Sequence, residues 1–396
     1  MKKLTLSLLV VSALFQSCSS DDDGGNQVVA PATYSFERGG ASSVSFSGQT
    51  TRILMAEEVV AALKDNTKTE AQIDAMFAHT ADANDFSDAD LNASGKNVRG
   101  KVAASTDFYS ANTTGSNEIK ADFDEWIASQ VSDVFPKWSY VAVAGQAGNL
   151  QQAGGGTVRY VNGKGLEYNQ AFAKGLIGGL MMDQILNNYL SPAVLDAGNN
   201  IENNDNGVLE EGKTYTTMEH KWDEAFGYLY GNEADITNPV LEADQFLSEY
   251  IDRVEKDSDF AGIATNVYNA FKLGRAAIVA GDYGVRDAQA EIIKENLSII
   301  PAVRAVFYLQ AGKTSLEVDK AKAFHALSEA YGFIYSLQFT RKPNATTPYL
   351  SKTEVDAYLA ELMEGNGFWD VTEETLDTIS AEISAEFGFT TEEAAN

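Results

Sequence analysis

The stretch "MEHKWDEAFGYLYG", residues 218–231, decides the fold that the sequence predicts, because a closely similar stretch recurs later in the chain. In the copies "HKWDEAFGYLY" (220–230) and "HALSEAYGFIY" (325–335), the His, Glu, Ala, Gly and last Tyr are identical. The two histidines lie 105 residues apart (325 minus 220), which is too long a spacing for a solenoid repeat. The duplication predicts a mainly α protein with two tandem, internally duplicated helical bundles and a short N-terminal β-hairpin.

Both copies are expected to be helices that begin with a capping box. Thr216 and Glu219 have the required spacing ahead of the first copy, and Thr314 and Glu317 have it ahead of the second. On such a helix the His, the Glu and the Gly three residues after the Glu share one face. Because Gly lowers helix stability, its presence on this face predicts close approach of a neighbouring helix.

Composition and periodicity divide the chain into five predicted parts. These are a lipoprotein signal peptide (1–17), a flexible acidic tether (18–32), a hairpin, helix and irregular segment (33–117), a first helical bundle (118–256), and a second bundle with a C-terminal helix (257–396). The hairpin is expected around Gly39-Gly40, and Pro136 is expected to kink the first bundle helix. Two long connections, 145–165 and 195–213, are expected to be loops, the first with a hairpin-turn signal at Asn162-Gly163.

The N-terminus has the features of a lipoprotein leader. Lys2 and Lys3 precede an apolar run from Leu4 to Phe15, which is too short to span a bilayer and is typical of a signal-peptide core. Cys18 is the only cysteine and follows this run directly. We therefore expect lipidation of Cys18 and attachment to a membrane through the lipid alone.

The charge balance excludes one class of partner. The chain contains 29 basic and 57 acidic residues, for a formal net charge of −28. Such a surface repels phosphate backbones, so nucleic acid is not expected as a partner. The same charge suits a soluble, exposed protein and the recruitment of cations.

Three segments carry a resemblance to a known family: "FSGQTTRI" (46–53), "DFDEWI" (122–127) and "YTTMEHKWDEAFGYLYG" (215–231). With the leader and the paired helices, they make the chain resemble the imelysin-like superfamily, and within it Bacteroidota lipoproteins known as a domain of unknown function. The imelysin motif is Gly-x-His-x-x-Glu, whereas here the glutamate after His220 is Glu224. The resemblance implies a periplasmic or outer-membrane location and a link to iron uptake.

The repeated pairs His220/Glu224 and His325/Glu329 are the candidate site residues, and three interpretations are open. Each pair is a buried hydrogen bond that orients helices, a metal or ligand site, or a general acid–base pair. Imidazole and carboxylate suit iron or zinc. The third histidine of the chain, His79, is expected at a helix end, and no His-Glu-x-x-His zinc signature is present in the sequence.

Other candidate ligands are weaker. Glu167 and Asp183, on the helix before the first motif, can supply oxygen ligands, and Arg275 and Arg286 can bind an anion or pair with Glu329. The loop "NNIENNDNGVLEE" carries oxygen-bearing side chains suited to calcium, but its spacing differs from that of an EF-hand.

These features favour a binding protein over an enzyme. We expect a surface-exposed lipoprotein of the outer membrane that serves iron or haem acquisition, with an outer-membrane receptor or an imelysin-like protein as partner, as the resemblance implies. Two alternatives remain open, a metal-dependent peptidase or hydrolase and a glycan-binding lipoprotein that partners a transporter.

Overall fold

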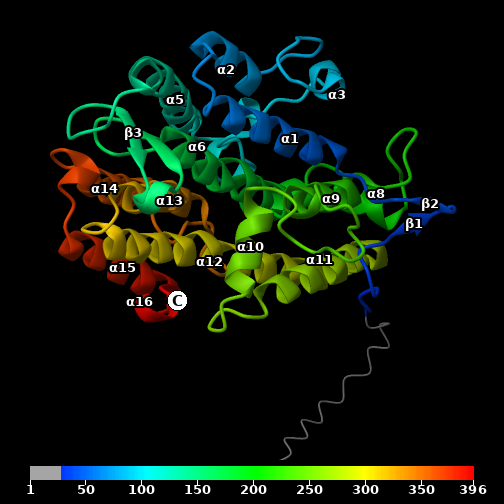
Figure 1. The fold of residues 1–396 in the computed structure, drawn as a ribbon. Coiled ribbons are helices and arrows are strands. Elements are labelled where there is room, and N and C mark those ends of the chain that lie inside the picture. Colours follow the sequence, from blue (N-terminus) through cyan, green and yellow to red (C-terminus); the bar gives the residue numbers. More distant parts are fainter. Residues whose placement is uncertain (1–27) are drawn as a thin grey trace, which may run out of the picture.

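The computed structural model describes residues 28–396, and helices dominate this part of the chain (Figure 1). The mainly α class is confirmed. The predicted leader, Cys18 and most of the tether lie outside the described residues. The α-helices are α1 (Ser47–Ala62), α2 (Glu70–Phe77), α3 (Ala89–Ala93), α4 (Thr106–Tyr109), α5 (Thr113–Ser129), α6 (Tyr168–Leu176), α7 (Pro192–Leu195), α8 (Asn200–Asp205), α9 (Thr217–Tyr230), α10 (Leu247–Glu255), α11 (Ile263–Ala280), α12 (Tyr283–Ser315), α13 (Lys320–Ser336), α14 (Lys352–Leu362), α15 (Glu373–Phe387) and α16 (Thr391–Ala394).

Shorter segments with π-helical or 3-10 geometry continue some of the α-helices or lie in the connections between elements. The π-helical segments are η2 (Gln130–Val134), η5 (Ile177–Met182) and η6 (Ile185–Tyr189), and the 3-10 turns are η1 (Arg99–Lys101), η3 (Phe135–Lys137), η4 (Ala153–Gly155), η7 (Leu337–Phe339) and η8 (Gly367–Trp369). Pro136 lies in the 3-10 turn η3, where the helix that began as α5 ends. Proline lacks a backbone N–H and stops the regular hydrogen-bond pattern, as predicted.

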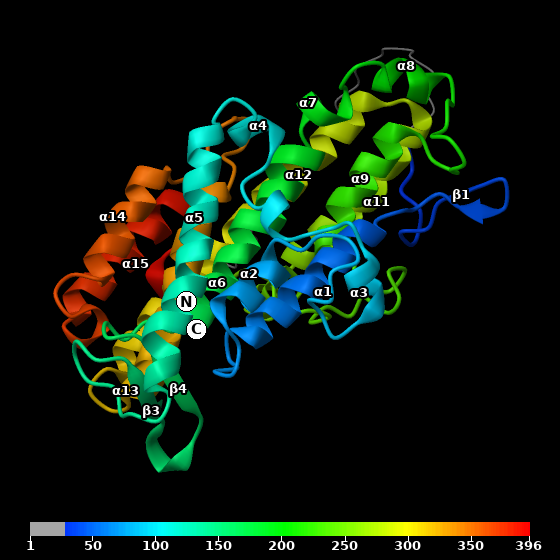
Figure 2. The same ribbon diagram turned by 90° about the horizontal axis from the view of Figure 1, so that it is seen from above.

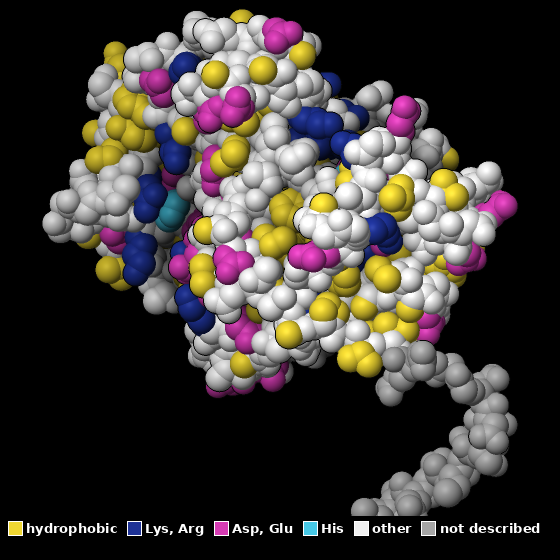
Figure 3. Space-filling model, turned by 90° about the vertical axis from the view of Figure 1, so that its right-hand side faces the viewer, with side chains coloured by type: hydrophobic (Ala, Val, Ile, Leu, Met, Phe, Trp, Pro, Cys, Tyr) yellow, Lys and Arg dark blue, Asp and Glu magenta, His cyan; other side chains and the backbone are white. Residues whose placement is uncertain are grey.

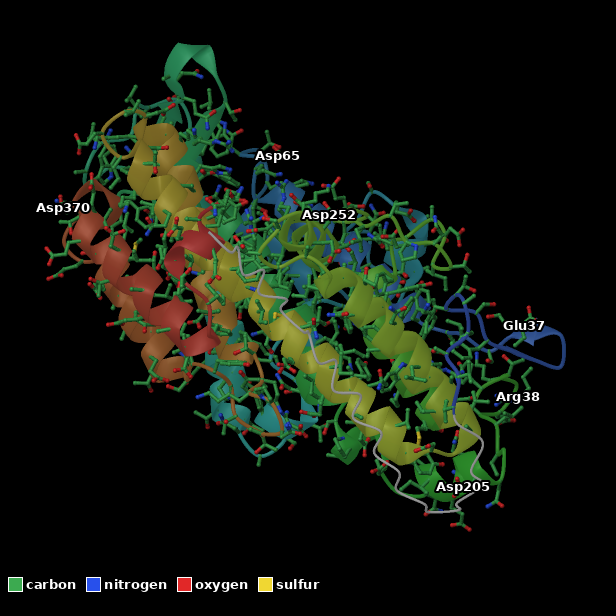
Figure 4. All side chains as sticks on the ribbon, turned by 90° about the horizontal axis from the view of Figure 1, so that it is seen from below. Glu37, Arg38, Asp65, Asp205, Asp252 and Asp370 are labelled. Carbon is green, nitrogen blue, oxygen red and sulfur yellow. The ribbon has the colours of Figure 1, made fainter. Side chains whose placement is uncertain are left out.

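The N-terminal hairpin is confirmed. β1 (Glu37–Arg38) pairs antiparallel with β2 (Ala41–Ser42). Gly39 and Gly40, which connect them, have φ angles of 63° and 82°. A two-residue hairpin turn with positive φ at both positions favours glycine. Figure 4 shows Glu37 and Arg38 on this hairpin at one end of the molecule, with Asp370 at the other end.

The prediction of a plain loop over residues 145–165 is wrong. β3 (Gly148–Gln151) and β4 (Val158–Val161) form a second antiparallel hairpin here. Its turn runs through Gly154 and Gly155, which both have positive φ, and not through Asn162-Gly163, which follows β4. The second predicted loop, 195–213, also contains a short helix, α8.

The capping box predicted at Thr314 and Glu317 is wrong as well. Helix α12 continues to Ser315, so Thr314 lies inside it and its Oγ1 donates to the carbonyl of Gln310 at 2.9 Å. Helix α13 begins after Asp319, whose carboxylate accepts from the backbone N–H of Lys322 at 3.0 Å. The box at Thr216 is confirmed, with Glu219 as its reciprocal partner.

Two long helical segments hold the molecule together (Figures 1 and 2). The first runs from α6 through η5 to η6, and the second is α12. The motif helix α13 packs most extensively against α12 and α6, whereas the motif helix α9 packs against η6, α1 and α11. One hydrophobic core contains buried side chains from both predicted bundles, so the contacts between helices cross the predicted boundary at residue 257.

Candidate functional site

The first motif, on α9, faces the start of α1. Nδ1 of His220 donates to the carbonyl of Ser45 at 3.0 Å, and the ring of Tyr215 stacks on the imidazole with centroids 4.6 Å apart. Glu224 accepts from Nε2 of Gln49 at 3.1 Å and from Nζ of Lys221 at 2.7 Å. His220 and Glu224 therefore each bind a residue at or just before the start of α1, and they do not bond to each other.

The second motif, on α13, faces the start of α6. Nδ1 of His325 lies 2.9 Å from Oε1 of Glu167, the N-cap residue of α6, and Nε2 lies 3.6 Å from Glu329. Glu329 accepts from the Tyr250 hydroxyl at 3.1 Å and lies 3.6 Å from Nζ of Lys174. Burial lowers the pKa of Lys174, and the charge of Glu329 opposes this shift. Glu167, a candidate oxygen ligand on sequence grounds, thus lies beside His325 in the structure.

The glycine of each motif lies where two helices cross, as predicted. A methyl group on Gly227 would collide with Cβ of Phe46, just before α1. A methyl group on Gly332 would lie 2.6 Å from Cβ of Lys174 and 3.0 Å from the carbonyl of Gln170, both on α6. The two copies thus share one architectural role, which is to cross the first turns of another helix.

A buried ion cluster fixes the chain segment that faces His220. Arg275 donates to Glu219 at 2.9 Å and to Asp223 at 3.1 Å, and all three side chains are fully buried. Arg38 also donates to Glu219, and the backbone N–H of Ser45 donates to Asp223 at 3.1 Å. The cluster therefore anchors the hairpin and Ser45 onto α9. The prediction that Arg275 pairs with Glu329 is wrong, because Arg275 reaches the carboxylates of α9 instead.

Basic side chains surround His220 and Glu224 in a pocket of about 470 Å³. We call this the cationic pocket. Figure 3 shows Lys and Arg side chains gathered around a histidine in a hollow of the surface. Its charged and ionisable lining residues are Arg52, Lys96, Lys101, Lys213, His220, Lys221 and Glu224, with Tyr189 and Tyr215 as aromatic walls.

The cations of this pocket are largely unpaired. Lys221 pairs with Glu224. Within residues 28–396, no carboxylate forms an ion pair with the other four cations, Arg52, Lys96, Lys101 and Lys213. This lack of partners is informative because acidic residues outnumber basic ones about two to one, 57 to 29.

Arg52 and Lys101 form the inner part of the pocket. Arg52 is 8% exposed and donates to the carbonyls of Asn97 and Gly48, both at 3.1 Å. Nζ of Lys101 lies 3.3 Å from the Tyr189 hydroxyl. Burial lowers the pKa of Lys101, and the positive charge of Arg52 lowers it further. The charge of Glu224 opposes these shifts, although Glu224 forms no ion pair with Lys101, so the two cations still destabilise each other.

Glu224 stays ionised on the wall of the cationic pocket. Burial alone would raise the pKa of its carboxyl, but the charge and hydrogen bond of Lys221 outweigh burial and hold the pKa below its usual range. Glu224 is thus a hydrogen-bond acceptor set among donors. It cannot serve as a protonated general acid at neutral pH.

The described residues do not support the interpretation of the motif pairs as a metal site. Among residues 28–396, no group of three His, Cys, Asp or Glu side chains is placed to hold a metal ion. His79 follows α2 and lies 2.6 Å from Asp85 and 3.2 Å from the carbonyl of Asn92, which suits a structural role. Arg286 pairs with Asp196 at 2.6 Å.

Asp183 and the loop considered for calcium also have structural partners. Asp183 accepts from the backbone N–H groups of Ala104 and Ser105, at 2.9 and 3.0 Å. In the loop, Asn204 donates to the carbonyl of Ile278 at 2.7 Å.

The repeat in the sequence marks His220 and Glu224 but not the cations around them. Arg52 stands in "FSGQTTRI", one of the segments that carry the family resemblance, and nothing in that segment marks it as a pocket residue. Lys96, Arg99 and Lys101 lie within the six residues of "KNVRGK" (96–101), which contain no acidic residue. In so acidic a chain, that local basic run was the available signal.

Comparisons with known proteins place the chain in a family without assigning a function. No helix within residues 28–396 combines the length and apolar character needed to cross a membrane. No curated protein and no solved structure matches the sequence. The model of one family, described as Domain of unknown function (DUF4856), matches residues 31–390, so the chain belongs to that family.

Proposed function

We propose that this protein binds a small anionic ligand in the cationic pocket. The observation that carries the proposal is the set of four cations that have no ion-pair partner within residues 28–396, in a chain with a formal net charge of −28. Like charges held close together destabilise one another, and an anion between them relieves that repulsion. The lowered pKa of Lys101 has this repulsion among its causes.

The neutral lining of the pocket supports binding of a polar ligand. Gln49, Thr106 and Asn188 add amide and hydroxyl groups to the charged ones. Small-molecule sites of about 300–1,000 Å³ use a few well-placed polar groups of this kind to orient a ligand. A free metal cation would be repelled, whereas an anionic metal chelate would not.

The cellular role follows from the leader and from the imelysin-like resemblance. We propose a lipoprotein attached through Cys18 to the outer membrane and exposed at the surface, where it serves iron or haem acquisition. An anionic ferric chelate such as ferric citrate suits both this role and the charge of the pocket. Replacement of Cys18 by Ser should release the protein from the membrane fraction, and a variant that stays there would contradict the lipid anchor.

Isothermal titration of the purified full-length protein with phosphate, sulfate, citrate and ferric citrate at low salt tests the binding function. We expect one binding event per chain and at least a tenfold loss of affinity in the double variant Lys96→Gln/Lys213→Gln. Both lysines are exposed, so this variant should keep its fold. Arg52→Gln/Lys101→Gln should lose more affinity, because these cations lie deeper.

The matched control is Arg253→Gln/Lys342→Gln, which removes two partly exposed cations outside the pocket. It lowers the net charge by the same amount and should bind the anion with little loss. Absence of binding for every anion would overturn the proposal. Equal losses in the control and the pocket variants would overturn it too, because the effect would then reflect net charge alone.

A further inference from the structure

We infer that the ligand carries a tetrahedral oxyanion, a phosphoryl or sulfuryl group, on a polyhydroxylated body, and that the oxyanion binds at the N-terminus of α1. The inference rests on the proposed function, since it specifies the anion that the cationic pocket takes. Three features carry it: the exposed start of α1, the placement of Arg52 beside that start, and Glu224, the single carboxylate that lines the pocket.

The N-terminus of α1 opens into the cationic pocket without a side-chain cap. Phe46 occupies the N-cap position, and the first turn contains no acidic residue. Ser47 and Gly48, the first two helical residues, line the pocket. Their backbone N–H groups have no partner within the helix. Such N–H groups, together with the positive end of the helix dipole, bind phosphate and sulfate in many proteins.

The guanidinium of Arg52 provides the second, independent observation. The side chain lines the pocket and is 8% exposed. Its bonds from Nε to Asn97 and from Nη1 to Gly48 use two of its five N–H donors. Nη1 lies 3.5 Å from the position of a Cβ at Gly48, so the guanidinium is beside the start of α1, and the hydroxyl of the buried Tyr228 is a further neighbour of the guanidinium. A buried arginine with a planar donor set suits a tetrahedral oxyanion, which presents several acceptors at once.

Gly48 lets the cations come close to the start of α1. A Cβ at this position would lie 3.2 Å from Cε of Lys96 and 3.5 Å from Nη1 of Arg52. A larger side chain would therefore push Lys96 away and fill the space in front of the helix. Two cations thus lie close to the first residues of the helix, an arrangement that suits a dianion.

The presence of Glu224 favours a ligand that carries hydroxyl groups as well as an anion. A carboxylate in an anion site repels the ligand, unless it accepts hydrogen bonds from hydroxyl groups of the same ligand. Gln49 and Lys221 hold Glu224 in place. Tyr215 and His220, whose rings stack on each other, also line the pocket and add polar and aromatic edges for the body of the ligand. The geometry points to a phosphorylated or sulfated sugar.

A set of related ligands tests the oxyanion and the sugar separately. The full-length protein is titrated with glucose 6-phosphate, glucose 6-sulfate, glucuronate, glucose and inorganic phosphate. We expect one of the two tetrahedral esters to bind at least tenfold more tightly than inorganic phosphate and than glucuronate, and glucose to bind far more weakly. The better of the two esters identifies the oxyanion.

Two variants test the placement. Gly48→Asp puts a carboxylate at the start of α1, where it should stabilise the helix and compete with the ester, so we expect loss of ester binding with the melting temperature kept or raised. Leu54→Asp adds the same charge to an exposed position of α1 and should bind as the parent does. Glu224→Gln should reduce the advantage of the ester over inorganic phosphate.

The outcomes distinguish this inference from the proposed function. If inorganic anions bind but neither ester binds more tightly, or if glucuronate equals the esters, the inference fails and the anion-binding function stands. Unchanged ester binding in Gly48→Asp also overturns the placement at α1. If no anion binds at all, both proposals fail.

Discussion

Nη1 of Arg52 donates to the carbonyl of Gly48 at 3.1 Å, one turn earlier in the same helix, and this bond turns the guanidinium toward the N-terminus of α1. The charge of Arg52 is thereby added to the positive end of the helix dipole instead of being placed in solvent. A buried cation without an acidic partner is costly for a folded chain. A ligand that supplies the missing negative charge offsets this cost.

The first prediction concerns the shape of this cation. Arg52→Lys keeps the positive charge but loses the planar set of donors, so it should weaken anion affinity about tenfold. Titration calorimetry measures this loss. Arg253→Lys, the same change at an exposed arginine, is the control. Equal affinity of Arg52→Lys and the parent would mean that charge alone matters at this position.

The second prediction concerns pH. Burial and the charge of Arg52 lower the pKa of Lys101 below its ordinary value of 10.5. Lys101 therefore loses its positive charge at a lower pH than an ordinary lysine does. The pocket loses anion affinity over the same pH range. Affinities measured from pH 7 to pH 10 should fall in the parent. Lys101→Arg, which stays charged, should remove most of the fall, and an unaltered fall would exclude Lys101 as its source.

Much of the fold is predictable because its signals are local. The 3.6-residue pattern and the box at Thr216 define α9, and Gly39-Gly40 defines the first hairpin. The errors arise where a longer-range contact prevails over a local signal. Thr314 has the residues of a capping box, but α12 continues past it because its buried face goes on packing against α13.

The third prediction concerns the motif glycines. Gly→Ala usually stabilises a helix by about 1 kcal/mol, but a methyl group at Gly227 meets Phe46, and one at Gly332 meets Lys174 and backbone carbonyls. We expect Gly227→Ala and Gly332→Ala each to lower the free energy of unfolding by about 1–3 kcal/mol. Urea denaturation measures the change. Gly95→Ala, with nothing within 4 Å of the added methyl group, should have little effect.

The cationic pocket was only partly predictable from the sequence. His220 and Glu224 stand out because the repeat marks them, whereas Arg52 and Lys101 reach the same pocket from α1 and η1. Their meeting depends on how α1 crosses α9, and that crossing is set by Gly227 and by the buried ion cluster. The spacing of residues within a single segment therefore does not predict this crossing.

The fourth prediction concerns the buried ion cluster. Arg275→Met leaves the carboxylates of Glu219 and Asp223 buried with fewer partners, and should lower the free energy of unfolding by about 3–5 kcal/mol. Arg253→Met breaks the partly exposed pair with Glu249 and should cost less than about 1 kcal/mol. Chemical denaturation compares the two variants. Similar small losses would show that the cluster does not hold the hairpin to α9.

The fifth prediction concerns Asp183, which lies fully buried between η5 and η6 with Oδ1 unpartnered among the described residues. Burial raises the pKa of its carboxyl to about 7, although Ser105 and Ala104 donate hydrogen bonds to it. The folded chain therefore holds a proton that the unfolded chain has released. Below the unfolded pKa of 3.8 the carboxyl is protonated in both states and does not destabilise the fold. As the pH rises toward 7, the unfolded chain releases the proton and the free energy of unfolding falls.

Asp183→Asn removes this pH dependence, because the amide stays neutral and its carbonyl can still accept from the backbone of Ala104 and Ser105. Relative to the parent, the free energy of unfolding of the variant should rise by about 2–4 kcal/mol between pH 4 and pH 8. Urea denaturation at the two pH values measures the change, with the exposed Asp90→Asn as control. A difference between Asp183→Asn and the parent that is the same at both pH values would show that Asp183 is ionised in the folded protein throughout this range, stabilised by the N–H groups of Ala104 and Ser105.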